Sequence, residues 1–270
     1  MKTPISYYGG KQTMVNVLLS MIPEHAIYTE LFFGGGSLFF VKKPSKLEVI
    51  NDTSDLCINF YRQLKMNYPE LKKLIEATLI SQSLHVKARR ICSGKIGSTD
   101  IEKAWAFWFS CTFGHTNKLG GGLKKSNDQF TSVPWILHNK KKQFTEHLSK
   151  RLENAFIDNR DAIVVLKGRN KENAFHYIDP PYLNADQGHY KGYTEEDFEK
   201  LLIFLQNDCT GKFLLSNYPS DILKDYASQN KWNISEFRHP SKHRSFLKTK
   251  NEVLVWNYKL PEQMQLEIYL

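Results

Sequence analysis

The sequence has no long hydrophobic run, few cysteines and no metal-binding spacing. No apolar stretch approaches the roughly 18 residues of a membrane span, and no charged start precedes an apolar core as in a secretory signal. The four cysteines, Cys57, Cys92, Cys111 and Cys209, are scattered without a Cys-x-x-Cys pair, which argues against a zinc site and a disulfide framework. We therefore expect a soluble cytoplasmic protein with reduced, buried thiols and no metal.

Two common glycine-rich nucleotide motifs are also missing. Gly34 and Gly36 follow a strand-like segment, but Phe39 stands where a dinucleotide fingerprint would have its third glycine. No Gly-Lys-Ser/Thr follows, so a P-loop is excluded. These absences argue against an NAD enzyme and against a P-loop NTPase.

Positive charge is in excess and is clustered. The formal net charge is +9 and the sequence pI is about 9.2. The basic residues form three patches, at Lys124 and Lys125, at Lys140, Lys141 and Lys142, and along residues 238–250 with Lys242, His243, Arg244 and Lys248. A single lysine run is more often a solvated surface. Together with nearby aromatic residues, the patches suit a polyanion whose bases can stack, such as a nucleic acid.

Strand-like and helix-like segments alternate at both ends of the chain, which is typical of an α/β fold. A short helix is expected from near Ser37, and Thr194 with Asp197 predicts a capping box that opens a helix over 194–205. The predicted strands are Ile27–Glu30, Leu47–Ile50, Ala155–Ile157, Ala174–Ile178, Phe213–Ser216 and Glu252–Asn257.

The middle of the chain has a different pattern. Residues 56–113 are helical in their apolar spacing, residues 114–139 read as a loop or hairpin rich in glycine, asparagine and lysine, and a further helix follows Gln143. The sequence therefore predicts a parallel-type sheet formed by residues 1–56 and 151–270, interrupted by a helical insertion over residues 57–150.

The tetrapeptide Asp179-Pro180-Pro181-Tyr182 directly follows the apolar run 174–178. In α/β folds ligands bind at the carboxyl ends of strands, where Asp179 is expected to lie. The prolines lack N–H groups, so the carbonyls of Asp179 and Pro180 can face a substrate without a competing donor. With the Asp179 carboxylate they suit an exocyclic NH2 group, and Tyr182 offers a face for a flat heterocycle.

Three further segments suit a nucleoside that carries an amino acid. The glycines at 34 and 36 allow close approach of a ligand to the backbone. Asp52 follows the second strand, where a carboxylate can accept ribose hydroxyls. Near the N-terminus, Tyr7 and Lys11 flank two glycines, and Lys11 can bind a carboxylate. S-adenosylmethionine is such a ligand.

Taken in order, Tyr7-Tyr8-Gly9-Gly10-Lys11, residues 30–37, Asp52 and residues 179–182 resemble the Dam-like class of N6-adenine DNA methyltransferases. The resemblance covers residues 1–56 and 155–258. It implies a Rossmann-like S-adenosylmethionine-dependent methyltransferase sheet with an inserted, mostly helical target-recognition domain. It also implies methyl transfer to an adenine extruded from double-stranded DNA.

The resemblance assigns roles to individual residues. Asp179, Pro180, Pro181 and Tyr182 are the implied catalytic tetrapeptide. The implied cofactor contacts are Tyr7, Lys11, Phe32, Gly34, Asp52, Asp161 and Asp179. Cytosine C5 methylation would instead need a Pro-Cys nucleophile, and the chain has no such pair.

The insertion departs from family members that read GATC. They resemble one another in a hairpin Arg-x-Asn-x-x-Gly-x-Phe-Asn, whereas residues 123–131 here read Leu-Lys-Lys-Ser-Asn-Asp-Gln-Phe-Thr, without that arginine and glycine. GATC is therefore not the predicted site. The expected DNA contacts are Lys124, Lys125, Asn127 and Gln129, and Lys242 and Arg244 in the later basic loop.

Two other functions stay open. The strand ending in Asp-Pro-Pro-Tyr also occurs in enzymes that methylate amines of RNA or of protein glutamine, and the basic charge would suit a DNA-binding module without activity. Lys11 and the helical insertion speak against the first, and the presence of Lys11, Asp52 and Asp179 speaks against the second. We expect a monomer, with any cognate restriction endonuclease on a separate chain.

Overall fold

The structure is a computed structural model, which describes residues 2–125, 132–182, 192–240 and 249–260. The chain divides into two compact units, each assembled from three separate stretches. The helical unit comprises Met1–Val15, Phe33–Lys43 and Asp52–Asn159, and the sheet unit comprises Asn16–Phe32, Pro44–Asn51 and Arg160–Leu270. The strands that precede the glycine turn and Asp52 therefore belong to the sheet unit, whereas the turn and Asp52 themselves belong to the helical unit.

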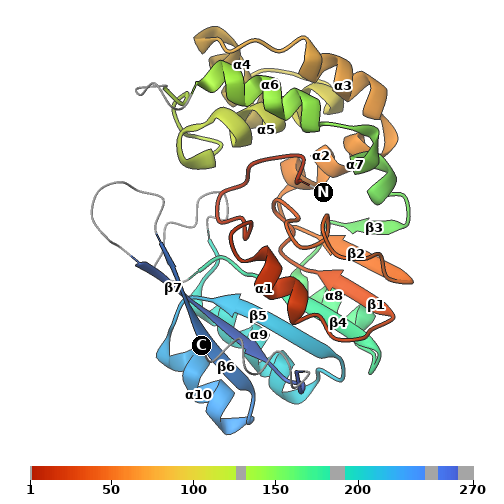
Figure 1. The fold of residues 1–270 in the computed structure, drawn as a ribbon, viewed down its shortest axis with the longest axis vertical. Helices are drawn as coiled ribbons and strands as arrows, with labels where there is room; N and C mark the ends of the chain where they lie inside the picture. The colour runs from red at the N-terminus through yellow and green to blue at the C-terminus, as the bar shows by residue number, and fades with distance from the viewer. Residues whose placement is uncertain (1, 126–131, 183–191, 241–248, 261–270) are drawn as a thin grey trace. The chain divides into compact units, whose positions relative to one another are not determined.

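The strands form a sheet with the order β3-β2-β1-β4-β5-β7-β6 (Figure 1). The strands β2, β1, β4 and β5 run parallel to one another, and β7 is antiparallel to both β5 and β6. The bounds are β1 Ile27–Glu30, β2 Leu47–Asn51, β3 Ala155–Asp158, β4 Ala174–Ile178, β5 Lys212–Asn217, β6 Asn233–Pro240 and β7 Thr249–Trp256. The order β3-β2-β1-β4-β5 is that of a doubly wound, Rossmann-like fold, which confirms the predicted fold class.

Strand β4 lies at the centre of the sheet unit, between β1 and β5. All five of its residues are buried. A parallel strand covered on both faces needs apolar side chains on both, and the continuous run 174–178 provides them. This burial fixes where the chain emerges at Asp179.

Helices cover both faces of the sheet unit. On one face α8 (Ala162–Arg169), α9 (Glu195–Asn207) and α10 (Asp221–Gln229) share an apolar core with the strands. On the other face lies α1 (Val15–Ser20), as Figure 1 shows. The predicted capping box is present, since the Thr194 side chain accepts from Asp197 N and the Asp197 side chain accepts from Thr194 N.

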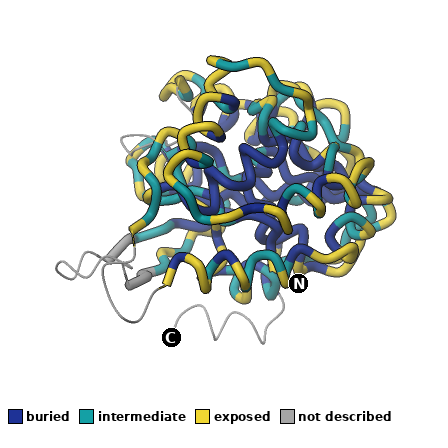
Figure 2. The backbone as a smooth tube through the Cα atoms, turned by 90° about the horizontal axis from the view of Figure 1, so that it is seen from above, coloured by how far each residue is buried: buried dark blue, intermediate teal, exposed yellow. Residues whose placement is uncertain are grey.

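The helical unit is built around α5. Ten consecutive residues of α5 are buried, and α5 packs against α2, α3 and α4. The outer helices alternate buried and exposed positions, visible in Figure 2 as alternating dark blue and yellow segments. The bounds are α2 Asp55–Met66, α3 Tyr68–Glu76, α4 Gln82–Cys92, α5 Asp100–Phe113, the 3-10 helix His115–Asn117, α6 Val133–Gln143 and α7 Glu146–Arg151.

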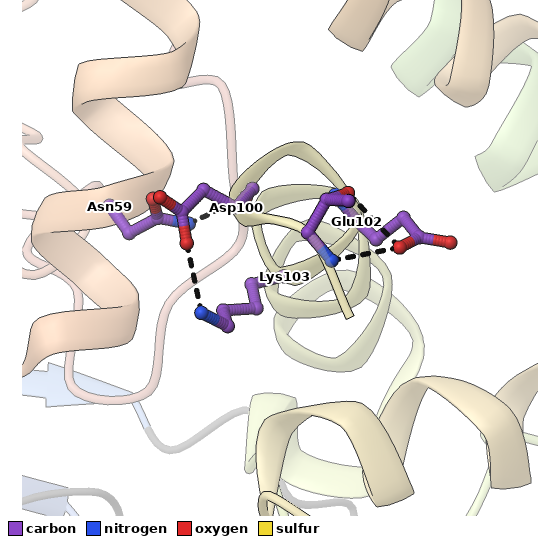
Figure 3. Close-up of polar contacts among 5 residues, drawn as sticks. Asn59, Asp100, Glu102 and Lys103 are labelled. Carbon is purple, nitrogen blue, oxygen red and sulfur yellow. Dashed lines mark hydrogen bonds and ion pairs between the residues drawn. The ribbon is translucent and has the colours of Figure 1, made fainter. Parts of the chain in front are cut away.

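The start of α5 is fixed by side chains (Figure 3). Thr99 Oγ1 accepts from Glu102 N, and Glu102 Oε2 accepts from Thr99 N at 2.9 Å. Asp100 pairs with Lys103 at 2.8 Å, and Asn59 of α2 donates to Asp100 O at 2.8 Å. These bonds satisfy backbone groups at the helix end and join α2 to the first turn of α5.

Two expectations about secondary structure were wrong, and one strand was missed. Residues after Ser37 form successive turns instead of a helix. The stretch 114–139 was expected as a loop or hairpin throughout, but α6 already begins at Val133, where Ser132 caps it. Strand β6 was not predicted. The six predicted strands are all present. All four cysteines are free thiols, but only Cys57 and Cys111 are buried as expected, whereas Cys92 and Cys209 are partly exposed.

Candidate active site

The glycine turn that follows β1 has a backbone that only glycine adopts easily. Gly34 has φ +46° and Gly36 has φ +62°, both in the left-handed region. A Cβ at Gly36 would lie 2.5 Å from Cζ of Phe33, whose ring is buried. The turn therefore needs its glycine at 36 for space as well as for conformation.

The N-terminal segment packs directly onto this turn. A Cβ on Gly35 would lie 3.0 Å from Cβ of Tyr7, so Tyr7 is in close contact with the backbone of the turn. Gly10 N donates to Tyr7 O at 3.2 Å, which bends the segment back on itself. Two of the predicted cofactor segments, far apart in sequence, are thus brought together within the helical unit.

Asp52 is fully buried and holds the turn through its carboxylate. One carboxylate oxygen accepts from Gly34 N at 2.9 Å and the other accepts from Ser54 N at 2.9 Å. The carbonyl of Gly34 is held as well, because Tyr61 Oη donates to it at 2.8 Å. Asp52 therefore has a visible structural role, and contact with a ribose stays a prediction.

Lys11 is also buried, with 5% of its surface exposed. Its Nζ donates to Gly9 O at 3.3 Å. Burying an ammonium is costly unless its hydrogens are bonded, so the bond to Gly9 O helps to hold Lys11 in this buried position. Tyr7, Gly34 and Asp52 thus meet at one glycine-rich turn of the helical unit, and Lys11 belongs to the segment that packs on this turn.

In the sheet unit the tetrapeptide follows β4 as predicted. Asp179 is half-buried, and Pro180 and Pro181 are buried. Tyr182 Oη donates to Asp179 Oδ1 at 3.2 Å and contacts Ser216 Oγ at 3.1 Å. Burial, and then the negative charges of Asp179 and Glu252, raise the pKa of Tyr182 well above its usual value, so its hydroxyl keeps its proton.

The end of β5 is the neighbour of this tetrapeptide. Strands β4 and β5 are parallel, with Ile178 opposite Leu215. Asp179, the residue that follows β4, is therefore next to Ser216 in the register of the two strands. The ring of Tyr218 packs on the ring of Tyr182, with centroids 4.3 Å apart and planes tilted by 54°. Neither Ser216 nor Tyr218 was singled out in the sequence.

Two other predicted cofactor residues lie elsewhere in the sheet unit. The ring of Phe32 meets Tyr193 edge-on, with centroids 5.8 Å apart. Asp161 caps α8, because its Oδ1 accepts from Ile163 N at 2.9 Å and from Val164 N at 3.2 Å. Both roles are structural ones, and the expected cofactor contacts stay predictions.

Asn51, the last residue of β2, is a buried residue that the sequence analysis missed. Its Nδ2 donates to Leu31 O and to Arg160 O, each at 3.0 Å, and its Oδ1 accepts from Arg160 N at 2.9 Å. One amide therefore joins the ends of β1 and β2 to the residue before Asp161. The signal in the sequence was a polar residue at the end of an apolar strand.

The expected DNA-binding lysines differ in their surroundings. Lys125 is exposed, whereas Lys124 donates to Thr112 O at 2.6 Å and to Asn117 Oδ1 at 2.5 Å. Burial lowers the pKa of Lys124 to about 8. The pKa of Lys140 is also lowered to about 8, first by burial and then by the positive charges of Lys124 and Lys2. Asn127, Gln129, Lys242 and Arg244 lie outside the described residues.

Comparison with known proteins decides the family. The model of the D12 class N6 adenine-specific DNA methyltransferases matches residues 7–251. The chain belongs to this family. The match spans both the Tyr7 segment and the Asp179 tetrapeptide, and DNA adenine methylation is therefore the activity class of this methyltransferase.

Individual relatives agree with this membership. The methyltransferase is 27% identical to the type II methyltransferase M1.LlaDCHI of Lactococcus lactis subsp. cremoris over 93% of both chains. It is 23% identical to the modification methylase StsI of Streptococcus sanguinis, covering 96% of this chain and 43% of that protein. An rRNA methylase structure from Streptococcus thermophilus is 10% identical, over 90% of this chain and 94% of that one, with a TM-score of 0.36. That last likeness is too weak to carry an argument.

Proposed function

We propose that this methyltransferase transfers the methyl group of S-adenosylmethionine to N6 of an adenine extruded from double-stranded DNA, at a specific sequence. The observation that carries the proposal is the Asp179-Pro180-Pro181-Tyr182 tetrapeptide at the end of the fully buried strand β4. The family match supplies the base and the position that is methylated.

The tetrapeptide suits the chemistry of an aromatic amine. The N6 lone pair of adenine is delocalised into the ring, so the amine is a weak nucleophile. Asp179 and the Pro180 carbonyl would each accept one N6 hydrogen, which favours a pyramidal nitrogen whose lone pair points at the methyl donor. A strong base is not required, because the methylated, positively charged amine loses its proton readily.

Tyr182 is proposed to stack on the target base. Extruding a base costs about a few kcal/mol, and stacking on an aromatic ring returns part of this. The hydroxyl of Tyr182 is bonded to Asp179 and Ser216, so the ring is held in one orientation before any substrate arrives. A preorganised ring loses less entropy on binding than a mobile one.

The helical unit fits S-adenosylmethionine at its glycine turn. The positive φ angles of Gly34 and Gly36, and the absence of Cβ atoms at residues 34–36, would let a ligand approach the backbone of the turn closely. When bound, the cofactor supplies an activated methyl group on a sulfonium. Tyr7, Lys11, Phe32, Gly34, Asp52 and Asp161 are proposed to hold it, with Lys11 at its carboxylate and Asp52 at its ribose.

The excess positive charge supports DNA as the substrate. A net charge of +9 favours association with the phosphate backbone, and this attraction weakens with salt. Lys125 is exposed and suited to a phosphate contact, whereas the ammonium of Lys124 is engaged within the protein. Lys124, Asn127, Gln129, Lys242 and Arg244 remain proposed DNA contacts.

We also propose a biological role, an oligomeric state and a location for this methyltransferase. The names of the relatives favour a role in restriction and modification, with the cognate endonuclease on a separate chain. No helix of the described residues is long and apolar enough to cross a membrane. We propose a cytoplasmic monomer with a helical target-recognition domain over residues 57–150, and the reaction of the adenine-specific class EC 2.1.1.72.

The test is methyl transfer from labelled S-adenosylmethionine to DNA, RNA and protein acceptors. Transfer to adenine N6 in double-stranded DNA is expected, and transfer only to RNA or to protein glutamine would refute the proposal. Asp179→Ala should abolish transfer and leave salt-dependent DNA binding unchanged, whereas Asp225→Ala, an exposed position of α10, serves as the matched control. Full turnover by Asp179→Ala would show that the mechanism is wrong.

A further inference from the structure

A short chain of hydroxyl groups ends at the Asp179 carboxylate. Tyr182 Oη lies 3.2 Å from Asp179 Oδ1 and 3.1 Å from Ser216 Oγ. A phenol has a single hydrogen, and a carboxylate can only accept, so the hydrogen of Tyr182 points at Asp179. The Ser216 hydroxyl must therefore donate to Tyr182 Oη. The hydrogen bonds thus run in one direction, from Ser216 to Tyr182 and from Tyr182 to Asp179.

The Ser216 end of this chain is fixed by the fold. Ser216 is fully buried in β5, one residue beyond the Leu215–Ile178 pair of the parallel strands. On its other side Ser216 lies opposite Leu254 of β7, so its backbone is held within the sheet. Burial also strengthens such bonds, because the local dielectric is low and each bond polarises the next.

Tyr218 supports the same tyrosine through its ring. The backbone of Tyr218 is held at the end of β5, since its N donates to Asn217 Oδ1 at 2.7 Å. Its ring lies with its centroid 4.3 Å from that of Tyr182. At this separation no base fits between the two rings, so a stacked base must use another part of the Tyr182 surface.

We propose that Ser216 and Tyr218 are positioning residues for methyl transfer, which hold Tyr182 and, through it, the Asp179 carboxylate in the orientation that the target amine requires. The proposal rests on the proposed function of the tetrapeptide. Neither residue needs to touch the substrate: Ser216 sets the direction of the hydroxyl, and Tyr218 sets the plane of the ring. A small misorientation of reacting groups lowers the rate of the chemical step more than it weakens binding.

Steady-state methylation of double-stranded DNA with labelled S-adenosylmethionine tests Ser216. Ser216→Ala should lower kcat about tenfold, the factor that corresponds to one hydrogen bond, with KM for DNA within about twofold of the parent value. Ser216→Thr, which retains the hydroxyl, should restore most of kcat. Ser228→Ala, an exposed serine of α10, should leave kcat unchanged.

Coupling to Tyr182 separates positioning from a general loss of stability. In a Tyr182→Phe background, Ser216→Ala should have no further effect on kcat, because the bond it removes is already gone. Tyr218→Leu should also lower kcat, while Tyr218→Phe, which keeps the ring, should remain within about twofold of the parent. The proposal would be overturned if Ser216→Ala had the kcat of the parent. It would also be overturned if Ser216→Ala lowered kcat by the same factor in the parent and in the Tyr182→Phe background.

A second measurement does not depend on activity. In urea unfolding, the equilibrium constant for unfolding should be about threefold to tenfold larger than the parent value in Ser216→Ala and in Tyr182→Phe. The double variant should have an equilibrium constant no larger than that of either single variant. Purely additive effects would overturn the hydroxyl chain. A parent protein that methylates no adenine would refute the proposed function instead, and the unfolding cycle would still decide whether the hydroxyl chain exists.

Discussion

Replacing Gly36 by alanine tests two reasons why this position needs glycine, its left-handed backbone and the lack of space for a Cβ. Gly36 has φ +62°, and a Cβ there would lie 2.5 Å from the ring of Phe33. That ring is enclosed, with Tyr61 at 4.6 Å and Phe39 at 5.5 Å between centroids. It cannot move away without disturbing the core of the helical unit, so Gly36→Ala strains both the backbone and the packing.

The magnitude follows from the two effects. A left-handed backbone costs a residue other than glycine about 1–2 kcal/mol, and overpacking a core costs about 1–3 kcal/mol. Alanine also restricts the unfolded chain, which returns about 0.4–1 kcal/mol. The free energy of unfolding of Gly36→Ala should therefore fall by roughly 2–4 kcal/mol.

Two other glycines of the helical unit are matched controls. Gly94 has φ +70° but no atom within 4 Å of an added Cβ, so Gly94→Ala should lose only about 0.5–1 kcal/mol. Gly97 has neither a positive φ nor a close neighbour, so Gly97→Ala should be as stable as the parent or more stable.

Urea unfolding followed by tryptophan fluorescence measures all three variants. The midpoints should fall in the order Gly97→Ala, Gly94→Ala, Gly36→Ala, with slopes unchanged. Equal midpoints for Gly36→Ala and Gly94→Ala would refute the steric argument. Gly36→Ala should also bind S-adenosylmethionine more weakly, as measured by calorimetry under conditions in which the variant is folded.

Three further outcomes are expected. The pKa of Lys140 is about 8, below its ordinary 10.5, so between these pH values the unfolded chain binds more protons than the folded protein and the free energy of unfolding rises with pH. In urea titrations, Lys140→Met should therefore have a larger free energy of unfolding than the parent at pH 7 and should lose this advantage by pH 10. Thr99→Ala removes the cap of α5 and should cost about 1 kcal/mol in thermal unfolding, against no loss for Ser228→Ala. Asn51→Asp replaces a buried donor by a carboxylate facing two carbonyls and should cost more than about 3 kcal/mol, whereas Asn59→Asp, at an exposed contact, should cost about 1 kcal/mol in the same assay.

The strands could be predicted where burial is continuous. Strand β4 was predicted residue for residue, because a strand covered on both faces has no polar interruptions. Strand β6 was not, since Asn233–Pro240 pairs only with β7 at the edge of the sheet and its side chains are mostly polar. The start of α6 was not predicted, because the preceding stretch is rich in glycine and lysine and was read as a loop. Ser132 and Pro134 are nevertheless ordinary signals for a helix start.

The helix expected near Ser37 failed for a local reason. Gly36 adopts a left-handed backbone, and the residues after it make short turns in which Phe40 N donates to Gly36 O and Val41 N donates to Leu38 O. The aromatic rings of this segment pack with Phe33 and Tyr61. Packing rather than helical propensity therefore decides the conformation of this segment.

The site could be predicted only in part. Residue type and position along the chain pointed to Asp179 and Tyr182, and the structure shows them bonded to each other. Ser216 and Asn51 could not be found in the same way, because their roles depend on which strands are neighbours and in which register. A serine within an apolar strand gives no sign in one sequence of the hydroxyl it will meet.

The position of β7 has a consequence for the synthesis of this protein. Strand β7 comes last of the seven along the chain, but it lies between β5 and β6 and pairs with both. Until it leaves the ribosome, β6 has no neighbour in the sheet and the outer edge of β5 is open. Strand β1 likewise waits for β4 until the whole helical unit has been made. The nascent chain therefore presents unpaired strand edges until β7 has been made, and the sheet is complete only once all seven of the described strands are available.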